Sequence, residues 1–167
     1  MSEIENAYLN RSSICLILRN VDGEVYQWKR LKIGIYALTK NMPDTKKENE
    51  SMIFNYKFKD LCYEGMTDRR ELVRDMDILE HNNYIDRIRV KKEGSMTDHD
   101  LIKLLPEGEE LADEAELLLT GTQINKLNEI TQTLKDENIL AEDLLFKYGK
   151  NWSKENVKYL IKSFKNQ

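Results

Sequence analysis

Histidine and cysteine, the usual ligands of structural zinc, are few in this chain of 167 residues, which has two of each. The two histidines, His81 and His99, stand far apart in the sequence, and His99 lies between Asp98 and Asp100. A structural zinc site usually takes four ligands in a tetrahedral arrangement, whereas a short polar run of this kind is typical of a solvated loop. We therefore expect no bound metal.

The motifs of nucleophilic catalysis and of phosphate binding are also missing. Cys15 and Cys62 each lie between apolar residues without a histidine nearby, a setting typical of buried free thiols in a reducing compartment. The chain contains no GxSxG, GxGxxG, GxxxxGKS or GxxxxGKT segment. We expect a protein that is not an enzyme and that binds no cofactor.

Positive side chains gather in the middle of the chain, in a pattern that could bind nucleic acid. Seven of them are candidate DNA-binding residues: Arg69, Arg70, Arg74, Arg87, Arg89, Lys91 and Lys92. Guanidinium and ammonium groups bind phosphate oxygens, and arginine also pairs with guanine edges. Five acidic residues in the same helical segment would repel phosphate: Asp68, Glu71, Asp75, Asp77 and Glu80. A solvated helix with internal ion pairs, or contact with protein only, is therefore the alternative.

The elements that would position these cations are indicated by the period of the apolar residues. A helix is predicted over 67–82, with Thr67 as its N-cap. Its apolar stripe is formed by Leu72, Val73, Met76 and Leu79. The period then changes to two, which predicts a β-hairpin within 84–105 whose second strand occupies 101–105. Pro106 is placed to begin the next helix.

Helices are expected on both sides of this segment. Before it, the predictions are helices over 8–19, 28–40 and 53–64, a short strand or extended lead-in at 25–28, and a loop over 41–51. After it, the predicted helices cover 107–119, 122–135, 138–148 and 153–165, with Gly121 and Gly149 at two of the breaks.

A helix, a second helix and a two-stranded hairpin in this order are typical of a winged helix-turn-helix, whose recognition helix precedes the wing. The fold predicted is mostly α with a small β-hairpin. Residues 1–106 would form the winged-helix core, with the recognition helix at 67–82 and the wing at 84–105. Residues 107–167 would form a C-terminal helical extension. That extension either wraps the core or pairs between subunits in a homodimer.

Several segments resemble the YwgA-like family of winged-helix proteins. Residues 28–38 resemble its "RLQKLVYLL" helix, and residues 63–79 resemble its "Y-G-x-[YF]-S-x-E-L-x-x-D-L-x-x-L" segment. The closing "x-L-T-x-x-G" of the wing is matched by residues 103–108, with Leu105 in place of threonine. Residues 144–152 resemble the helix that ends in "Y-x-K-Y-P". PadR-type and MarR-type proteins share the recognition-helix and wing portion. The resemblance implies a winged-helix fold and a regulatory role, and it brings no enzymatic activity.

The net charge of −4 and its distribution limit the kinds of partner that the chain can bind. The acidic surplus lies in residues 105–167, so the chain is not a strongly basic nucleic-acid binder, and DNA binding requires the local cluster above. Residues 1–13 are polar, and the apolar runs at 14–18 and 33–38 are too short to span a bilayer, so we expect a cytoplasmic protein. The main hypothesis is a transcription regulator that binds double-stranded DNA. The alternative is a non-catalytic module that docks a protein, for instance a toxin, through its acidic C-terminal half.

Overall fold

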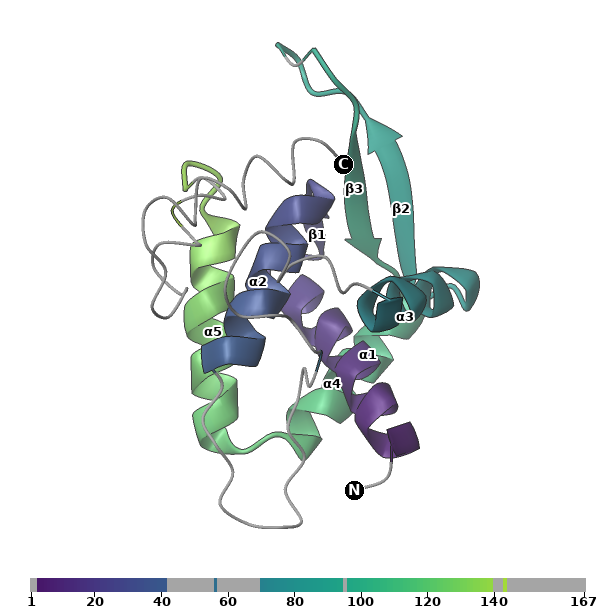
Figure 1. The fold of residues 1–167 in the computed structure, drawn as a ribbon, viewed down its shortest axis with the longest axis vertical. Coiled ribbons are helices and arrows are strands. Elements are labelled where there is room, and N and C mark those ends of the chain that lie inside the picture. Colours follow the sequence, from purple (N-terminus) through teal and green to yellow (C-terminus); the bar gives the residue numbers. More distant parts are fainter. Residues whose placement is uncertain (1–2, 42–55, 57–69, 95, 140–142, 144–167) are drawn as a thin grey trace.

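The computed structural model describes residues 3–41, 56, 70–94, 96–139 and 143. Within these ranges the chain is mostly helical and carries one small antiparallel sheet (Figure 1). The elements in chain order are α1 (Glu3–Asn20), β1 (Glu24–Tyr26), α2 (Trp28–Asn41), α3 (Arg70–His81), β2 (Ile85–Val90), β3 (His99–Leu104), α4 (Pro106–Leu118) and α5 (Gly121–Lys135). The prediction of a mostly α protein with a small β-hairpin is confirmed at this level.

The sheet has the strand order β1-β3-β2, and both pairings are antiparallel. β2 and β3 form the predicted hairpin, although β3 begins at His99, two residues before the predicted strand. β1 adds a third strand through the pairing of Val25 with Ile102. Of the short strand or extended lead-in predicted at 25–28, the structure has the strand, because the free edge of β3 offers it backbone partners.

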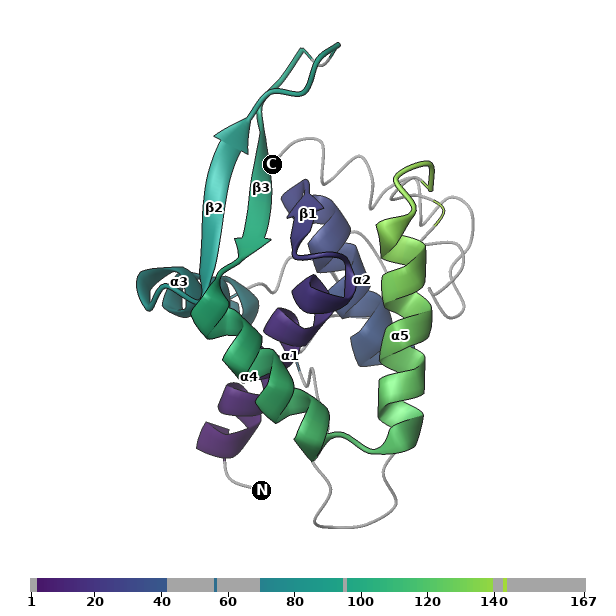
Figure 2. The same ribbon diagram turned by 180° about the vertical axis from the view of Figure 1, so that it is seen from behind.

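α1 lies in the middle of the molecule and packs against α3, α4 and α5 (Figures 1 and 2). Its five consecutive residues from Ile14 to Leu18 are all buried. A helical segment that is apolar on every side must be covered on every side, which explains why this part of α1 lies in the centre of the fold. α2 buries the predicted stripe of Leu31, Ile35 and Leu38 and packs against α5.

The two helices that follow the sheet belong to the same core. Ala112 and Ala115 of α4 are fully buried in a helix that packs on α1, and Leu127 and Ile130 of α5 are equally buried. The sequence left open whether residues 107–167 wrap the core or pair between subunits. The described helices of this segment, α4 and α5, pack on the core of their own chain. Residues 140–142 and 144–167 lie outside the described residues, and most of the helices predicted at 138–148 and 153–165, with Gly149, falls there. The helix predicted at 53–64 also lies outside them, except for Tyr56.

Turn and cap chemistry sets the ends of several elements. The turn predicted after α1 holds Asp22 and Gly23 at positive φ values of 65° and 91°. Thr120, rather than Gly121, is the boundary between α4 and α5, because its side chain and that of Gln123 form a capping box. Gly121 was predicted as a break, and it is instead the first residue of α5.

Gly108 lies in the first turn of α4, close to the end of the sheet. A Cβ atom at this position would lie 2.3 Å from the backbone oxygen of Tyr84 and 2.5 Å from Cδ1 of Leu104. Tyr84 O already accepts a hydrogen bond from Leu105 N at 3.0 Å. The first turn of α4 can approach the hairpin this closely only because residue 108 has no side chain.

Candidate nucleic-acid interface

α3 presents one face to the core and one to solvent. Leu72, Met76 and Leu79 are buried as predicted. Val73, which was predicted to belong to the same stripe, is 39% exposed. The correction follows from helix geometry, because residue 73 is rotated by about 100° from residue 72 and away from residues 76 and 79. The inward position that remains is occupied by Asp75.

The structure describes the side chain of only one of the three cations predicted on the recognition helix. Arg69 lies outside the described residues, and of Arg70 only the backbone at the start of α3 is described. Arg74 is exposed, and within the described part of the chain its side chain makes no ion pair. Asp77, one turn further along α3, is also exposed.

Arg87 of β2 turns back to α3 rather than outward. Its guanidinium donates to Asp77 at 2.7 Å and to Glu80 at 2.8 Å. These hydrogen bonds raise the pKa of Arg87 and lower the pKa of Glu80 from its usual range. The ion pairs join the last two turns of α3 to the first half of β2, so Arg87 holds the helix and the hairpin at one angle.

The other three hairpin cations lie further along. Arg89, two residues on along the same strand, pairs with Asp100 of β3 at 3.2 Å, and its side chain is 67% exposed. Lys91 is exposed and has no ion pair within the described residues. Lys92 turns toward β1, where its ammonium lies 4.3 Å from the centre of the Tyr26 ring and 3.5 Å from Glu137.

The structure therefore divides the predicted set of seven cations. Arg74 and Arg87 lie at α3, Arg89 and Lys91 extend along the hairpin, and Lys92 faces the end of α5. Four acidic residues pair with or lie beside these cations: Asp77, Glu80, Asp100 and Glu137.

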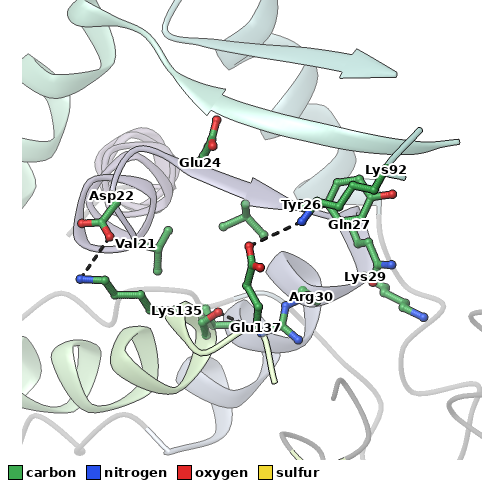
Figure 3. A pocket seen from close by; sticks show the side chains of 12 residues that line it. Val21, Asp22, Glu24, Tyr26, Gln27, Lys29, Arg30, Lys92, Lys135 and Glu137 are labelled. Carbon is green, nitrogen blue, oxygen red and sulfur yellow. Dashed lines mark hydrogen bonds and ion pairs between the residues drawn. The ribbon is translucent and has the colours of Figure 1, made fainter. Parts of the chain in front are cut away.

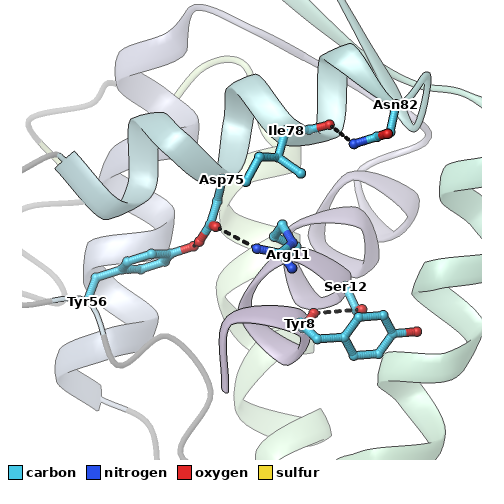
Figure 4. A network of polar contacts seen from close by, with 7 residues as sticks. All are labelled: Tyr8, Arg11, Ser12, Tyr56, Asp75, Ile78 and Asn82. Carbon is cyan, nitrogen blue, oxygen red and sulfur yellow. Dashed lines mark hydrogen bonds and ion pairs between the residues drawn. The ribbon is translucent and has the colours of Figure 1, made fainter. Parts of the chain in front are cut away.

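A buried polar network behind α3 was not predicted from the sequence. Tyr56 donates its hydroxyl hydrogen to Oδ2 of Asp75 at 2.5 Å, and Arg11 of α1 donates to Oδ1 of Asp75 at 3.3 Å (Figure 4). Burial raises the pKa of Asp75, against the opposing effects of Tyr56 and Arg11. Burial and the neighbouring carboxylate raise the pKa of Tyr56 well above its usual value.

This network changes the interpretation of Asp75. The sequence placed it among the acids that would repel phosphate, but its carboxylate faces α1 and Tyr56. The signal was present in the spacing, because residue 75 shares a helix face with Leu72, Met76 and Leu79. A carboxylate on an apolar helix face indicates a buried partner.

The remaining candidates for chemistry are placed as follows. His99 lies beside Thr97, with 3.0 Å between its Nε2 and the threonine hydroxyl, and its ring meets that of Tyr26 edge to face. Among the described residues, no three side chains of His, Cys, Asp or Glu are grouped so that they could hold a metal ion. Cys15 is buried, and burial raises the pKa of its thiol to about 12. Cys62 lies outside the described residues.

Comparison of the chain with protein-family models, with characterised proteins and with solved structures found no match. None of the helices in the described ranges combines the length and the apolar character needed to cross a bilayer. Any functional assignment consequently rests on the sequence and the geometry of this chain.

Proposed function

We propose that this chain is a winged-helix protein that binds double-stranded DNA and acts as a transcription regulator. The observation that carries the proposal is the order of the described elements. α3 leads directly into the β2–β3 hairpin, and β1 completes a three-stranded sheet on the opposite edge of β3. In winged-helix proteins the helix before the hairpin enters the major groove, and the hairpin follows the backbone.

The resemblance to the YwgA-like family adds support at one residue. Gly108 matches the glycine that closes the family's wing motif, and the close approach of Tyr84 and Leu104 gives a physical reason for glycine there. The same contact seats α4 on the hairpin. Residues 1–106 would then form the winged-helix core, with residues 107–167 as a helical extension that α4 begins.

We propose as DNA contacts the cations that can bind a phosphate oxygen, either because they have no ion pair or because phosphate can replace the carboxylate they now bind. Arg74 and Lys91 are exposed without ion pairs among the described residues, and Arg89 and Lys92 make exposed pairs. An exposed pair contributes about 0–1 kcal/mol, so phosphate oxygens can replace its carboxylate. Arg69 and Arg70 remain in the proposed set. Arg87 is proposed as a positioning residue, because two carboxylates hold its guanidinium against α3.

Fluorescence anisotropy tests the proposal directly. DNA from upstream of the coding sequence and random genomic fragments are titrated at two salt concentrations. Affinity should fall steeply with salt, and the variants Arg74→Ala and Lys91→Ala should each lower the slope of log K against log salt by about one unit.

Lys126→Ala is the matched control, since Lys126 lies on α5, on the other side of the molecule from α3 (Figures 1 and 2). Its slope should equal that of the unmodified protein. Absence of binding at micromolar protein and low salt, or equal slopes for all three variants, refutes the proposal.

A second function, docking of a basic protein partner, is favoured by the outer face of α4. Glu109 and Glu110 are exposed there, and Leu117 and Leu118 are 86% and 56% exposed. A homodimer formed through these helices would also have to use this end of α4, because the other apolar residues of α4 and α5 are largely buried in the core.

The two functions respond oppositely to charge changes. If the partner is a protein, Arg74→Glu with Arg89→Glu should leave binding intact, and neutralising Glu109, Glu110 and Asp113 should weaken it. If the partner is DNA, the first pair should abolish binding, and the second set should leave it unchanged or strengthen it.

A further inference from the structure

A cavity of about 510 Å³ lies where β1, the first turn of α2, the chain just after β2 and the end of α5 meet (Figure 3). Its volume falls within the range of sites that bind small molecules. Residues from four separate parts of the chain line it, among them Tyr26, Gln27, Lys29, Lys92 and Glu137. Of the residues named here, only Lys92 belongs to the DNA contacts proposed above.

Two neighbouring residues of the lining, Tyr26 and Gln27, have features that a folded chain usually avoids. The hydroxyl of Tyr26 is buried and has no hydrogen-bond partner in the described structure. A buried hydroxyl without a partner is unfavourable, and such groups in folded proteins usually have an identifiable cause. Gln27, the next residue, has φ of 80°, a left-handed backbone conformation that costs energy for a side chain other than glycine and clusters at ligand sites.

The balance of charge in the cavity favours an anion. Asp22 pairs with Lys135 at 3.1 Å, and Glu137 pairs with Lys92 at 3.5 Å. Glu24, the third acid of the lining, is exposed. Two further cations line the cavity, Lys29 and Arg30.

These two cations differ in their availability. The guanidinium of Arg30 donates to the backbone oxygens of Leu134 at 2.9 Å and Asp136 at 3.2 Å, and so caps α5. Lys29 is half-buried and makes no ion pair within the described residues. Its ammonium is therefore available to a ligand. The ammonium of Lys92 is held by an exposed pair with Glu137, which an anionic ligand can replace.

We propose that this cavity binds a small organic anion, a carboxylate or a phosphate ester. Lys29 and Lys92 bind the charged group, and the Gln27 side chain provides a hydrogen bond. Coupling to DNA follows only if the proposed function holds. An anion that engages Lys92 keeps this lysine against β1 and α5 and away from phosphates, so it lowers the affinity for DNA.

Binding is tested without DNA, by titrating the isotope-labelled full chain at constant ionic strength and following its amide resonances. The anionic probes are inorganic phosphate, adenosine monophosphate and benzoate, and the neutral matches are adenosine and benzamide. At least one anion should give saturable shifts at Gln27, Lys29 and Glu137 at about millimolar concentration. Phosphate and adenosine monophosphate report on a phosphate group, and benzoate reports on a carboxylate.

Charge-neutral variants locate the site. Lys29→Gln should weaken binding of the responding anion about fivefold or more, because it removes a charge-assisted hydrogen bond. Lys103→Gln, which removes an exposed lysine of the sheet outside the cavity, should leave it unchanged. Unsaturable shifts for all three anions, equal responses to the neutral matches, or equal affinities of the two variants overturn the proposal.

The coupling has its own readout. Adding the responding anion to a DNA titration at fixed ionic strength should weaken DNA binding by the unmodified protein and not by Lys29→Gln. Saturable anion binding with unchanged DNA affinity refutes the coupling alone. Failure of DNA binding under all conditions refutes the proposed function and leaves the anion site standing on its own titration.

Discussion

Replacing Gly108 by alanine tests how α4 is seated on the hairpin. The new methyl carbon would lie 2.3 Å from the backbone oxygen of Tyr84, which is more than 1 Å inside ordinary contact distance. The nearest obstacle is backbone, so no rotamer change relieves it. Either α4 or the turn at Tyr84 has to move, and the hydrogen bond from Leu105 N to Tyr84 O lengthens or breaks.

The expected cost combines three effects. Overpacking of this kind costs about 1–3 kcal/mol, and loss of the backbone hydrogen bond costs about 1 kcal/mol. The greater helix propensity of alanine offsets up to about 1 kcal/mol. We expect Gly108→Ala to lower the free energy of unfolding by about 1–3 kcal/mol.

Gly121→Ala is the matched control. This glycine, like Gly108, lies in the first turn of a helix, but nothing lies within 4 Å of the Cβ that alanine would add. Alanine there should raise the free energy of unfolding by about 0.5 kcal/mol, because it restricts the unfolded chain. Urea unfolding followed by far-ultraviolet circular dichroism measures both values. If Gly108→Ala is as stable as Gly121→Ala, the proposed seating of α4 is wrong.

Three further outcomes follow from buried groups. Tyr56→Phe should lower the free energy of unfolding by about 2 kcal/mol in the same urea assay, since it removes a hydrogen bond to a buried carboxylate; an unchanged midpoint would contradict this. The pKa of Asp75 is raised in the folded state above 3.8, so the folded protein retains this proton while the unfolded chain loses it. We compare the free energy of unfolding of the unmodified protein with that of Asp75→Asn, which cannot titrate at this position. The unmodified value minus the Asp75→Asn value should fall as pH rises from about 4 through the folded pKa of Asp75. A difference that rises with pH would exclude the mechanism. The Cys15 thiol, with a pKa of about 12, should react with a thiol reagent at pH 8 only on unfolding, measured in a Cys62→Ser background; prompt reaction of the folded protein would show that Cys15 is accessible.

The sequence by itself located most of the described elements. The helices at 28–41 and 70–81 and the hairpin between Ile85 and Leu104 lie within a few residues of their predicted bounds. Local backbone geometry makes this possible, because a helix face repeats every 3.6 residues and a strand face every two. Pro106 marked the start of α4 for an equally local reason, since its fixed φ suits the first turn of a helix.

The partners of the polar side chains were decided only by the tertiary structure. Asp75 is held by Arg11, 64 positions earlier, and Lys92 reaches Glu137 near the end of the described chain. The sequence predicted that Arg87 contacts DNA. In the structure β2 lies beside α3, and Arg87 pairs with Asp77 and Glu80. Such contacts leave no periodic signal, because they depend on the distances and angles between packed elements, whereas period and turn chemistry are properties of neighbouring residues.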